Sequence, residues 1–302
     1  MKFLKKILAL LLIVSMVLSA VSCGGKGDDV DNTDNGDDTS PVSESYTVRV
    51  VNPFGHPVQG VTVFVHEDGG ADYNVCTVPT VTDSAGSAVF QLEKGKSYSV
   101  GLMGVHKAYL TKSGATRAER YAIDSVNTVI TLDSNPDYSP KKYDLGDPIA
   151  NLAITDIDGN SYMLYDLLAE KDALVLNFWF YDCTPCRSEF PALNSAYNTY
   201  KSDIELFAVN DKDPLTKVQS YAKDKGLTLD MHLVKSTAGS PLSLSKFDSA
   251  YYPTTVVVDR YGIISFVHDE AVPTAATWEK LFAFFTADDY THTIISDLSD
   301  IG

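Results

Sequence analysis

The sequence predicts two folded parts of different class, an all-β sandwich followed by an α/β domain. Residues 46–132 contain short alternating strands separated by turns, and no long helical pattern interrupts them. From residue 143 onward, continuous apolar runs alternate with helical periodicity, which is typical of a sheet that helices cover on both faces. The 302 residues are enough for about two such domains.

The charge balance argues against nucleic acid as a partner. The chain carries 24 Lys and Arg residues against 40 Asp and Glu residues, a formal net charge of −16 at pH 7. Phosphate binding needs clustered cations, whereas an acidic surface mainly favours solubility. Apolar residues make up 44% of the chain, which is ample for packed cores.

Residues 1–22 are predicted to be a signal peptide. Three lysines precede an almost unbroken apolar run from Ile7 to Leu18, which is short for a stable membrane span. The segment "LSAVSCGG" around Cys23 resembles a bacterial lipoprotein signal, in which the cysteine is acylated and becomes the mature N-terminus. That resemblance implies a lipid anchor on Cys23 and a location at the extracytoplasmic face of a bacterial cell membrane. A transmembrane anchor that is never cleaved is the alternative.

Residues 23–44 are predicted to be a flexible acidic tether. The stretch "GGKGDDVDNTDNGDDTS" has no aromatic residue, one apolar side chain and six aspartates. Such a composition buries too little surface to offset the entropy lost on ordering. A calcium-binding loop is the alternative, but the ligand spacing and the closing Glu of such a loop are missing.

Residues 45–133 are predicted to form the β-sandwich. "YTVRVV" and "VTVFVHE" alternate, and the Pro- and Gly-rich "NPFGHPVQG" between them is typical of a turn. The segments "VVNPFGHPVQGVTVFV" and "TDSAGSAVFQLEKGKSYSV" resemble the carboxypeptidase regulatory-like, or transthyretin-like, β-sandwich. The resemblance implies a spacer or a binding module. Cys76 is predicted to be a buried small residue, with pairing to another chain as the alternative.

The Pro- and Ser-rich residues 134–142 are predicted to be an interdomain linker, residues 143–290 the α/β domain, and residues 291–302 a C-terminal tail. Continuous apolar runs predict buried strands at 173–180 and 204–210. Further elements are predicted as two strands at "TTVVVD" and "IISFVH", a helix from Asp213–Pro214 to near Gly226, and a helix whose apolar face is Trp278, Leu281, Phe282 and Phe285.

The motif that carries chemistry is "CTPC", which begins at Cys183. A buried strand is predicted to end near Phe180 and a helix to begin at the cysteines, so Cys183 is expected at a helix N-terminus. Free backbone N–H groups and the positive end of the helix dipole stabilise a thiolate there. Pro185 suits the first turn, where its missing N–H costs nothing. Cys186 lies one turn further on, close enough to close a disulfide with Cys183.

Three other interpretations of the cysteine pair stay open. Structural zinc needs four ligands, and the sequence has no second C-x-x-C motif or paired His. Copper held by two cysteines and a distant histidine normally has a longer spacing between the cysteines. A fixed structural disulfide, or an inactive remnant of a redox pair, is the third. No metal and no cofactor are predicted.

The surroundings of the motif resemble one known family. "LVLNFWFYDCTPCRSEFPALN", preceded by "DPIANLAITDIDGNSYMLYDL", is similar to the TlpA/ResA group of membrane-tethered thiol–disulfide oxidoreductases, which have a thioredoxin-like fold. The similarity runs from about Tyr143 to about Phe285. Pro191 matches the proline that kinks the helix behind the active site. "YYPTTVVVDRYGII" matches the family's Pro-Thr-Thr segment, which implies a cis bond at Tyr252–Pro253 that faces the disulfide.

The resemblance also implies the roles of individual residues. Cys183 and Cys186 are expected to form the redox disulfide, with Glu189 as a third catalytic residue. An exposed helix glutamate is the alternative for Glu189. Asn177 stands where thioredoxins bury an aspartate that handles protons. The other expected site residues are Tyr252, Pro253 and Thr254 at the substrate, and Trp179, Asp182 and Pro185 as active-site lining.

Two positions depart from the family pattern. Asp182 stands where the family usually has Trp, and its carboxylate is expected to oppose thiolate formation and so to raise the pKa of Cys183. Tyr252 is bulkier than the usual residue before the cis proline and is expected to narrow the substrate groove. Both departures bear on the substrate and the redox potential rather than on the cysteine pair.

The predicted function is that of a membrane-anchored extracytoplasmic thiol–disulfide oxidoreductase, more specifically a protein-disulfide reductase. Its expected partners are protein thiols or disulfides and a thiol electron donor that works across the membrane. Two alternatives stay open: a non-enzymatic cell-surface binding protein with a redox-inert thioredoxin fold, and a thiol peroxidase. The peroxidase motif Pro-x-x-x-Thr-x-x-Cys has Phe180 at its Thr position here, which argues against peroxidase chemistry.

Overall fold

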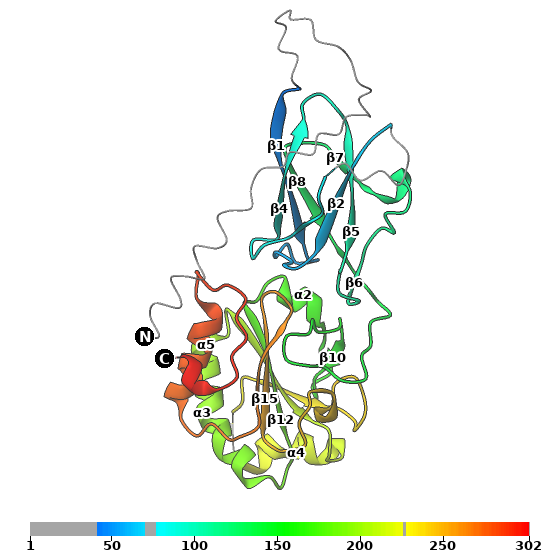
Figure 1. Ribbon diagram of the computed structural model, residues 1–302. Helices are drawn as coiled ribbons and strands as arrows, with labels where there is room; N and C mark the ends of the chain where they lie inside the picture. Colours follow the sequence, from blue (N-terminus) through cyan, green and yellow to red (C-terminus); the bar gives the residue numbers. More distant parts are fainter. Residues whose placement is uncertain (1–40, 70–76, 226–227, 302) are drawn as a thin grey trace, which may run out of the picture. The chain divides into compact units, whose positions relative to one another are not determined.

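The computed structural model describes residues 41–69, 77–225 and 228–301 (Figure 1). These residues form two compact units. The N-terminal unit comprises the described residues of 41–51, 57–105 and 111–131, and the C-terminal unit comprises those of 52–56, 106–110 and 132–301. The signal peptide, Cys23, most of the acidic tether and Cys76 lie outside the described residues, so their predicted roles stay predictions.

The N-terminal unit contains two β-sheets. The three-stranded sheet has the order β4 (Ser87–Glu93), β1 (Ser43–Val51), β8 (Asn127–Thr131). The four-stranded sheet has the order β3 (Thr80–Val81), β2 (Thr62–Glu67), β5 (Tyr98–Met103), β7 (Tyr121–Ile123). Strand β1 is antiparallel to β4 and parallel to β8, whereas neighbours in the second sheet are all antiparallel. The predicted β content of this region is therefore confirmed.

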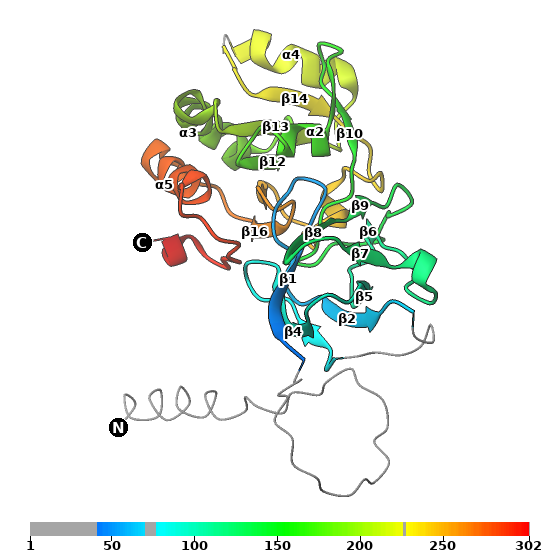
Figure 2. The same ribbon diagram turned by 90° about the horizontal axis from the view of Figure 1, so that it is seen from above.

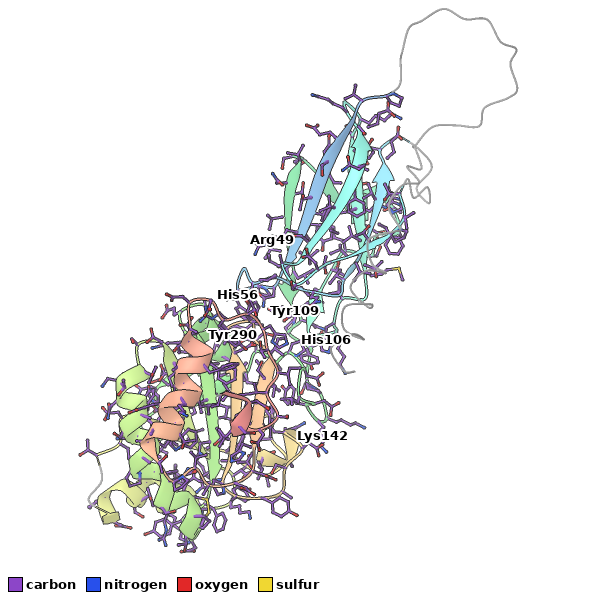
Figure 3. The ribbon with its side chains drawn as sticks, turned by 60° about the vertical axis from the view of Figure 1, so that its left-hand side comes forward. Arg49, His56, His106, Tyr109, Lys142 and Tyr290 are labelled. Carbon is purple, nitrogen blue, oxygen red and sulfur yellow. A yellow bond between two sulfur atoms is a disulfide. The ribbon has the colours of Figure 1, made fainter. Side chains whose placement is uncertain are left out.

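Period-two alternation explains why these segments form strands. On β1, Val48 and Val50 are fully buried, and Arg49 between them is exposed (Figure 3). On β2, Val63 and Val65 are likewise fully buried. Successive strand residues point to opposite sides of a sheet, so this spacing places the valines on one face. The assignment to the carboxypeptidase regulatory-like sandwich remains a prediction.

The C-terminal unit is built on a five-stranded sheet. Its order is β14 (His232–Lys235), β13 (Ile204–Asn210), β12 (Ala173–Trp179), β15 (Thr254–Asp259), β16 (Ile264–His268). Strands β12, β13 and β14 are parallel, whereas β15 and β16 are antiparallel to their neighbours. This mixed sheet with its crossover helices is a thioredoxin-like fold, so the predicted fold of the C-terminal part is confirmed.

Alternate side chains of β12 pack into two apolar cores, one on each face of the sheet. Val175 and Trp179 pack into the core under α3 (Thr184–Tyr200), α4 (Leu215–Lys225) and α5 (Ala275–Thr286). Leu174 and Leu176 pack into the other core with α2 (Leu164–Leu168) and the hairpin β10–β11 (Ala153–Thr155 and Ser161–Met163). Helices α3 and α5 lie beside each other on their face of the sheet (Figures 1 and 2). A continuous apolar strand is required because both of its faces are covered.

The structure differs from the sequence prediction in local details. Helix α4 begins at Leu215, two residues after Asp213, and the Asp213 carboxylate accepts hydrogen bonds from the Tyr181 amide and the Asn210 side chain. Three further elements were not predicted from the sequence, namely α2, the β10–β11 hairpin and β14. At the end of the predicted linker, Lys142 pairs with Asp248 (Figure 3).

Candidate active site

The two cysteines of the C-x-x-C motif form a disulfide at the start of α3. Cys183 is the N-cap residue, with extended backbone angles, and its sulfur accepts a hydrogen bond from the Cys186 amide at 3.2 Å. The Cα atoms of the two cysteines are 5.4 Å apart, within the usual range for a disulfide. Pro185 lies in the first turn, as predicted. The helix therefore offers an N–H group, and the positive end of its dipole, to the sulfur of Cys183.

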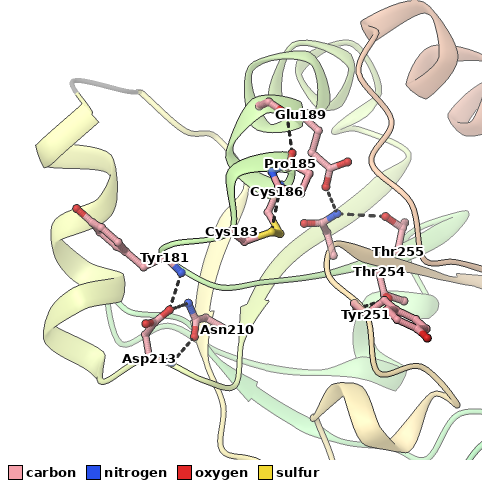
Figure 4. Close-up of a disulfide and its surroundings, with 12 residues drawn as sticks. Tyr181, Cys183, Pro185, Cys186, Glu189, Asn210, Asp213, Tyr251, Thr254 and Thr255 are labelled. Atoms are coloured by element: carbon pink, nitrogen blue, oxygen red, sulfur yellow. Dashed lines mark hydrogen bonds between the residues drawn. A yellow bond between two sulfur atoms is a disulfide. The ribbon is translucent and has the colours of Figure 1, made fainter.

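The two sulfurs differ in their access to solvent. Cys186 is fully buried, whereas Cys183 retains 4% of its surface. Thr184 and Pro185, between them, are exposed. Both cysteines belong to the apolar core beneath α3 (Figure 4). An incoming sulfur therefore meets Cys183 first, through a small exposed area.

The segment before β15 contains the predicted cis bond. The peptide bond between Tyr252 and Pro253 is cis. Pro253 is buried and Tyr252 is half-buried, while Tyr251 is 69% exposed. The buried Thr254 hydroxyl bonds to the Tyr251 carbonyl at 2.8 Å (Figure 4). This bond links the residues on either side of the cis peptide at the amino end of β15.

Glu189 is buried behind the disulfide, on the first turns of α3. The side-chain amide of Asn177 on β12 donates to Oε1 of Glu189 at 2.9 Å (Figure 4). The Val272 backbone N–H donates to Oε2 at 2.9 Å. The same Asn177 amide donates to Thr255 Oγ1 at 3.1 Å. Burial raises the pKa of Glu189 to about 7, although the two hydrogen bonds to its carboxylate lower the pKa. The exposed-glutamate alternative is therefore wrong.

Asp182 carries a charge that a lysine offsets. Its exposed carboxylate pairs with the Lys217 ammonium at 2.6 Å, and Lys217 also lies 3.4 Å from Asp213. The hydrogen bond to Asp182 is the main reason that the pKa of Lys217 is raised. The sequence predicted a carboxylate beside Cys183, and the structure adds a compensating cation next to that carboxylate. A cation this close to the carboxylate offsets the effect of the negative charge on its surroundings.

Trp179 was expected to line the site, and the structure places it deeper. Its side chain is fully buried and packs against the rings of Phe190 and Tyr221, with centroid distances of 5.2 and 4.8 Å. It shares the apolar core with Cys183 and Cys186. Trp179 therefore supports the disulfide from beneath and presents no surface to a substrate.

A second polar cluster lies on the strands away from the disulfide. The His232 ring has Nδ1 at 3.2 Å from Asp156 Oδ2 and Nε2 at 3.2 Å from Glu205 Oε1. The Tyr197 hydroxyl donates to the same Glu205 oxygen at 2.5 Å. Both ring nitrogens face carboxylates, which suits an imidazolium that donates from each nitrogen. The pKa of His232 is accordingly raised, chiefly by the hydrogen bond to Glu205.

The described residues contain neither a metal-binding cluster nor a membrane-spanning helix. Within the described residues, no three His, Cys, Asp or Glu side chains are grouped so that they could hold a metal ion. None of the helices described here combines the length and the apolar character needed to cross a bilayer.

The C-terminal unit is similar to known thiol–disulfide oxidoreductases. Residues 145–267 match the sequence profile of the AhpC/TSA family. The thiol-disulfide oxidoreductase ResA from Halalkalibacterium halodurans is 30% identical over 124 residues, which cover 41% of this chain and 67% of that protein. ResA from Geobacillus kaustophilus is 29% identical over 119 residues, 39% of this chain and 65% of that protein. The chain thus spans about two thirds of the length of these relatives.

Solved structures show more distant similarity. A thiol:disulfide interchange protein of the thioredoxin family from Chlorobium tepidum TLS is 21% identical, with a TM-score of 0.41, and covers 48% of this chain and 99% of that chain. A putative thioredoxin from Neisseria meningitidis is 24% identical, with a TM-score of 0.41, and covers 48% of this chain and 94% of that chain.

Proposed function

The chain belongs to the ResA family of thiol-disulfide oxidoreductases, and from that premise we propose that it exchanges disulfides with protein substrates through Cys183 and Cys186. The observation that carries the proposal is the disulfide itself. It spans the first turn of a helix, it presents one sulfur to solvent, and an amide N–H already points at that sulfur.

The proposed reaction starts from the reduced pair. The Cys183 thiolate attacks one sulfur of a substrate disulfide, and the other substrate sulfur leaves as a thiolate that takes up a proton. The Cys186 thiolate then attacks Cys183 in the mixed disulfide and releases the second substrate sulfur. The substrate gains two electrons and two protons, and Cys183–Cys186 ends oxidised. The Cys186 N–H and the helix dipole stabilise the charge on Cys183 at each stage.

Glu189 is the proposed proton-handling residue. A carboxyl group with a pKa of about 7 is close to evenly divided between its protonated and ionised forms at neutral pH. It lies one turn beyond Cys186 on the same helix, beneath the surface. We therefore assign to Glu189 the transfer of the proton that Cys186 loses before it resolves the mixed disulfide.

The direction and location of the reaction follow from the wider resemblance. The protein would act as a protein-disulfide reductase, resupplied by a thiol electron donor that works across the membrane. A lipid on Cys23 would anchor it at the extracytoplasmic face of a bacterial cell membrane. The acidic tether and the N-terminal unit would then space the redox unit from the bilayer.

Reduction of insulin disulfides by dithiothreitol tests the proposal. The parent protein should accelerate the reaction, and Cys183→Ser and Cys186→Ser should each abolish the acceleration. Ser195→Ala, an exposed position on the same helix, is the matched control and should keep full activity. No acceleration by the parent, or full activity in both cysteine variants, would support the redox-inert binding protein instead. Reduction of hydrogen peroxide that depends on Cys183 would support the peroxidase.

A further inference from the structure

A lysine and two aromatic rings form a stack beside the disulfide. The Lys212 ammonium lies 4.7 Å from the centre of the Phe180 ring and 4.2 Å from the centre of the Tyr252 ring. The two rings meet edge to face, with centroids 5.3 Å apart. We call Phe180, Lys212 and Tyr252 the cation–aromatic stack. Cation–π attraction favours this arrangement and restricts the motion of the lysine side chain.

The topology explains why these residues meet at the active site. Phe180 directly follows β12, and Lys212 lies two residues after β13, at the carboxyl ends of two parallel strands. Tyr252 lies two residues before β15, which is antiparallel to β12 and therefore begins at the same edge of the sheet. The Phe180 carbonyl accepts a hydrogen bond from the Cys183 amide at 3.1 Å. The stack is thus joined directly to the turn that carries the reactive sulfur.

Lys212 differs from Lys217 in its ionic contacts within the part of the chain that the structure describes. Lys217 pairs with two carboxylates, whereas exposed Lys212 forms no ion pair with the described residues. Its neighbour Asp211 is buried, and the carboxylate accepts hydrogen bonds from the Tyr252 hydroxyl at 2.6 Å and the Leu244 amide at 2.9 Å. Asp211 therefore holds the tyrosine ring in place, and both of its oxygens bond to groups other than Lys212.

We propose that the cation–aromatic stack selects protein substrates with an acidic side chain next to the reactive cysteine. This inference rests on the proposed function, because it concerns the substrate of that same site. A substrate strand that places its sulfur on Cys183 must pass the residues next to cis Pro253. The methylenes of a neighbouring Glu would lie against the rings, and its carboxylate would reach the Lys212 ammonium. The rings hold the ammonium in place, so less side-chain entropy is lost when the pair forms.

The test compares symmetric peptide disulfides that differ only beside the cysteine. Three peptides carry Glu, Gln or Lys there, and kcat/KM is measured for each with an excess of dithiothreitol at low salt. The parent protein should prefer the Glu peptide to the Lys peptide by about tenfold, the size expected when a solvent-exposed ion pair replaces a like-charge contact. Lys212→Gln should remove the preference for the Glu peptide, and Lys212→Glu should reverse it. Lys212→Arg keeps the positive charge and should keep the parent's preference.

Two controls separate this inference from the proposed function. Lys201→Gln, at the opposite end of α3, should keep the parent's preference. The preference should also shrink as salt is raised, because exposed charges are screened. A parent that reduces all three peptides equally, or a Lys212→Glu variant with the parent's preference, overturns the inference and leaves the redox function intact. A parent that reduces none of them overturns the proposed function and this inference together.

Discussion

The side-chain amide of Asn177 donates a hydrogen bond to Glu189 at 2.9 Å, and both residues are fully buried. The amide is a neutral partner, so it stabilises the carboxylate without supplying a compensating charge. The Val272 N–H on the other oxygen is neutral as well. The carboxyl group is therefore held in place while its pKa stays well above that of an exposed glutamate.

The first prediction concerns the pH dependence of stability. The folded protein keeps the Glu189 proton up to about pH 7, whereas the unfolded chain releases it near pH 4.5. Between these values the unfolded state binds fewer protons, so the contribution of Glu189 to the free energy of unfolding falls as pH rises, by about 3 kcal/mol in total. Glu189→Gln should remove this loss. Urea titrations at pH 5 and pH 8 measure the free energy of unfolding. At pH 8 this free energy should be higher for the variant, relative to the parent, than it is at pH 5.

The matched control for that prediction is Glu279→Gln on α5, a half-buried position. Its free energy of unfolding should change between pH 5 and pH 8 by the same amount as that of the parent. An equal change in stability for the parent and Glu189→Gln from pH 5 to pH 8 would contradict the assignment of a near-neutral pKa to Glu189.

The second prediction concerns the acidity of Cys183. Asp182→Asn removes the exposed carboxylate next to Cys183 in the sequence and leaves Lys217 paired with Asp213, so the pKa of the Cys183 thiol should fall. Lys217→Gln removes the cation and should raise that pKa by a similar amount. The rate of alkylation by iodoacetamide as a function of pH, in the reduced protein, measures both. Shifts in the same direction would show that this ion pair does not act on the thiolate.

The third prediction concerns His232. Its pKa is raised by the bond to Glu205, so its contribution to stability is present in full below the unfolded pKa and is lost as pH rises through the folded value. His232→Gln should therefore destabilise the protein on the order of 1 kcal/mol near pH 6 and less near pH 9. His268→Gln, on the edge strand β16, is the control. If His232→Gln lowers the free energy of unfolding equally at both pH values, the ring is not protonated in the folded protein.

The fourth prediction concerns access to the two sulfurs. In the reduced native protein, a maleimide should modify Cys183 at least about ten times faster than Cys186, because only Cys183 has exposed surface. Peptide mass spectrometry after short pulses measures both rates. In guanidinium chloride the two rates should become similar. Equal rates in the native protein would show that the first turn of α3 opens on reduction.

Local sequence patterns were enough to predict much of the C-terminal unit. The apolar run ending near Phe180 predicted β12, and the position of Pro185 predicted the start of α3. The family resemblance predicted the cis bond before Pro253, and the structure contains it. Strand β14 was missed because it has four residues and no clear alternation. Short elements of this kind are fixed by their neighbours rather than by their own propensity.

The site was harder to predict than the fold. The burial of Glu189 depends on Val272, which lies 83 positions away in the sequence. The cation–aromatic stack joins residues from three strand ends, and the pair of Asp182 and Lys217 joins the segment after β12 to helix α4. Sequence patterns report which residues share one element, whereas these contacts depend on how the elements pack.

The disulfide offers one sulfur to the outside, and this has a kinetic consequence. In the proposed reaction, a substrate and an electron donor both dock over Cys183, so neither is expected to bind while the other is present. The protein is expected to shuttle between oxidised and reduced forms in a double-displacement cycle. Reciprocal plots at different donor concentrations should then be parallel, and an excess of either reactant should inhibit turnover by occupying the wrong redox form.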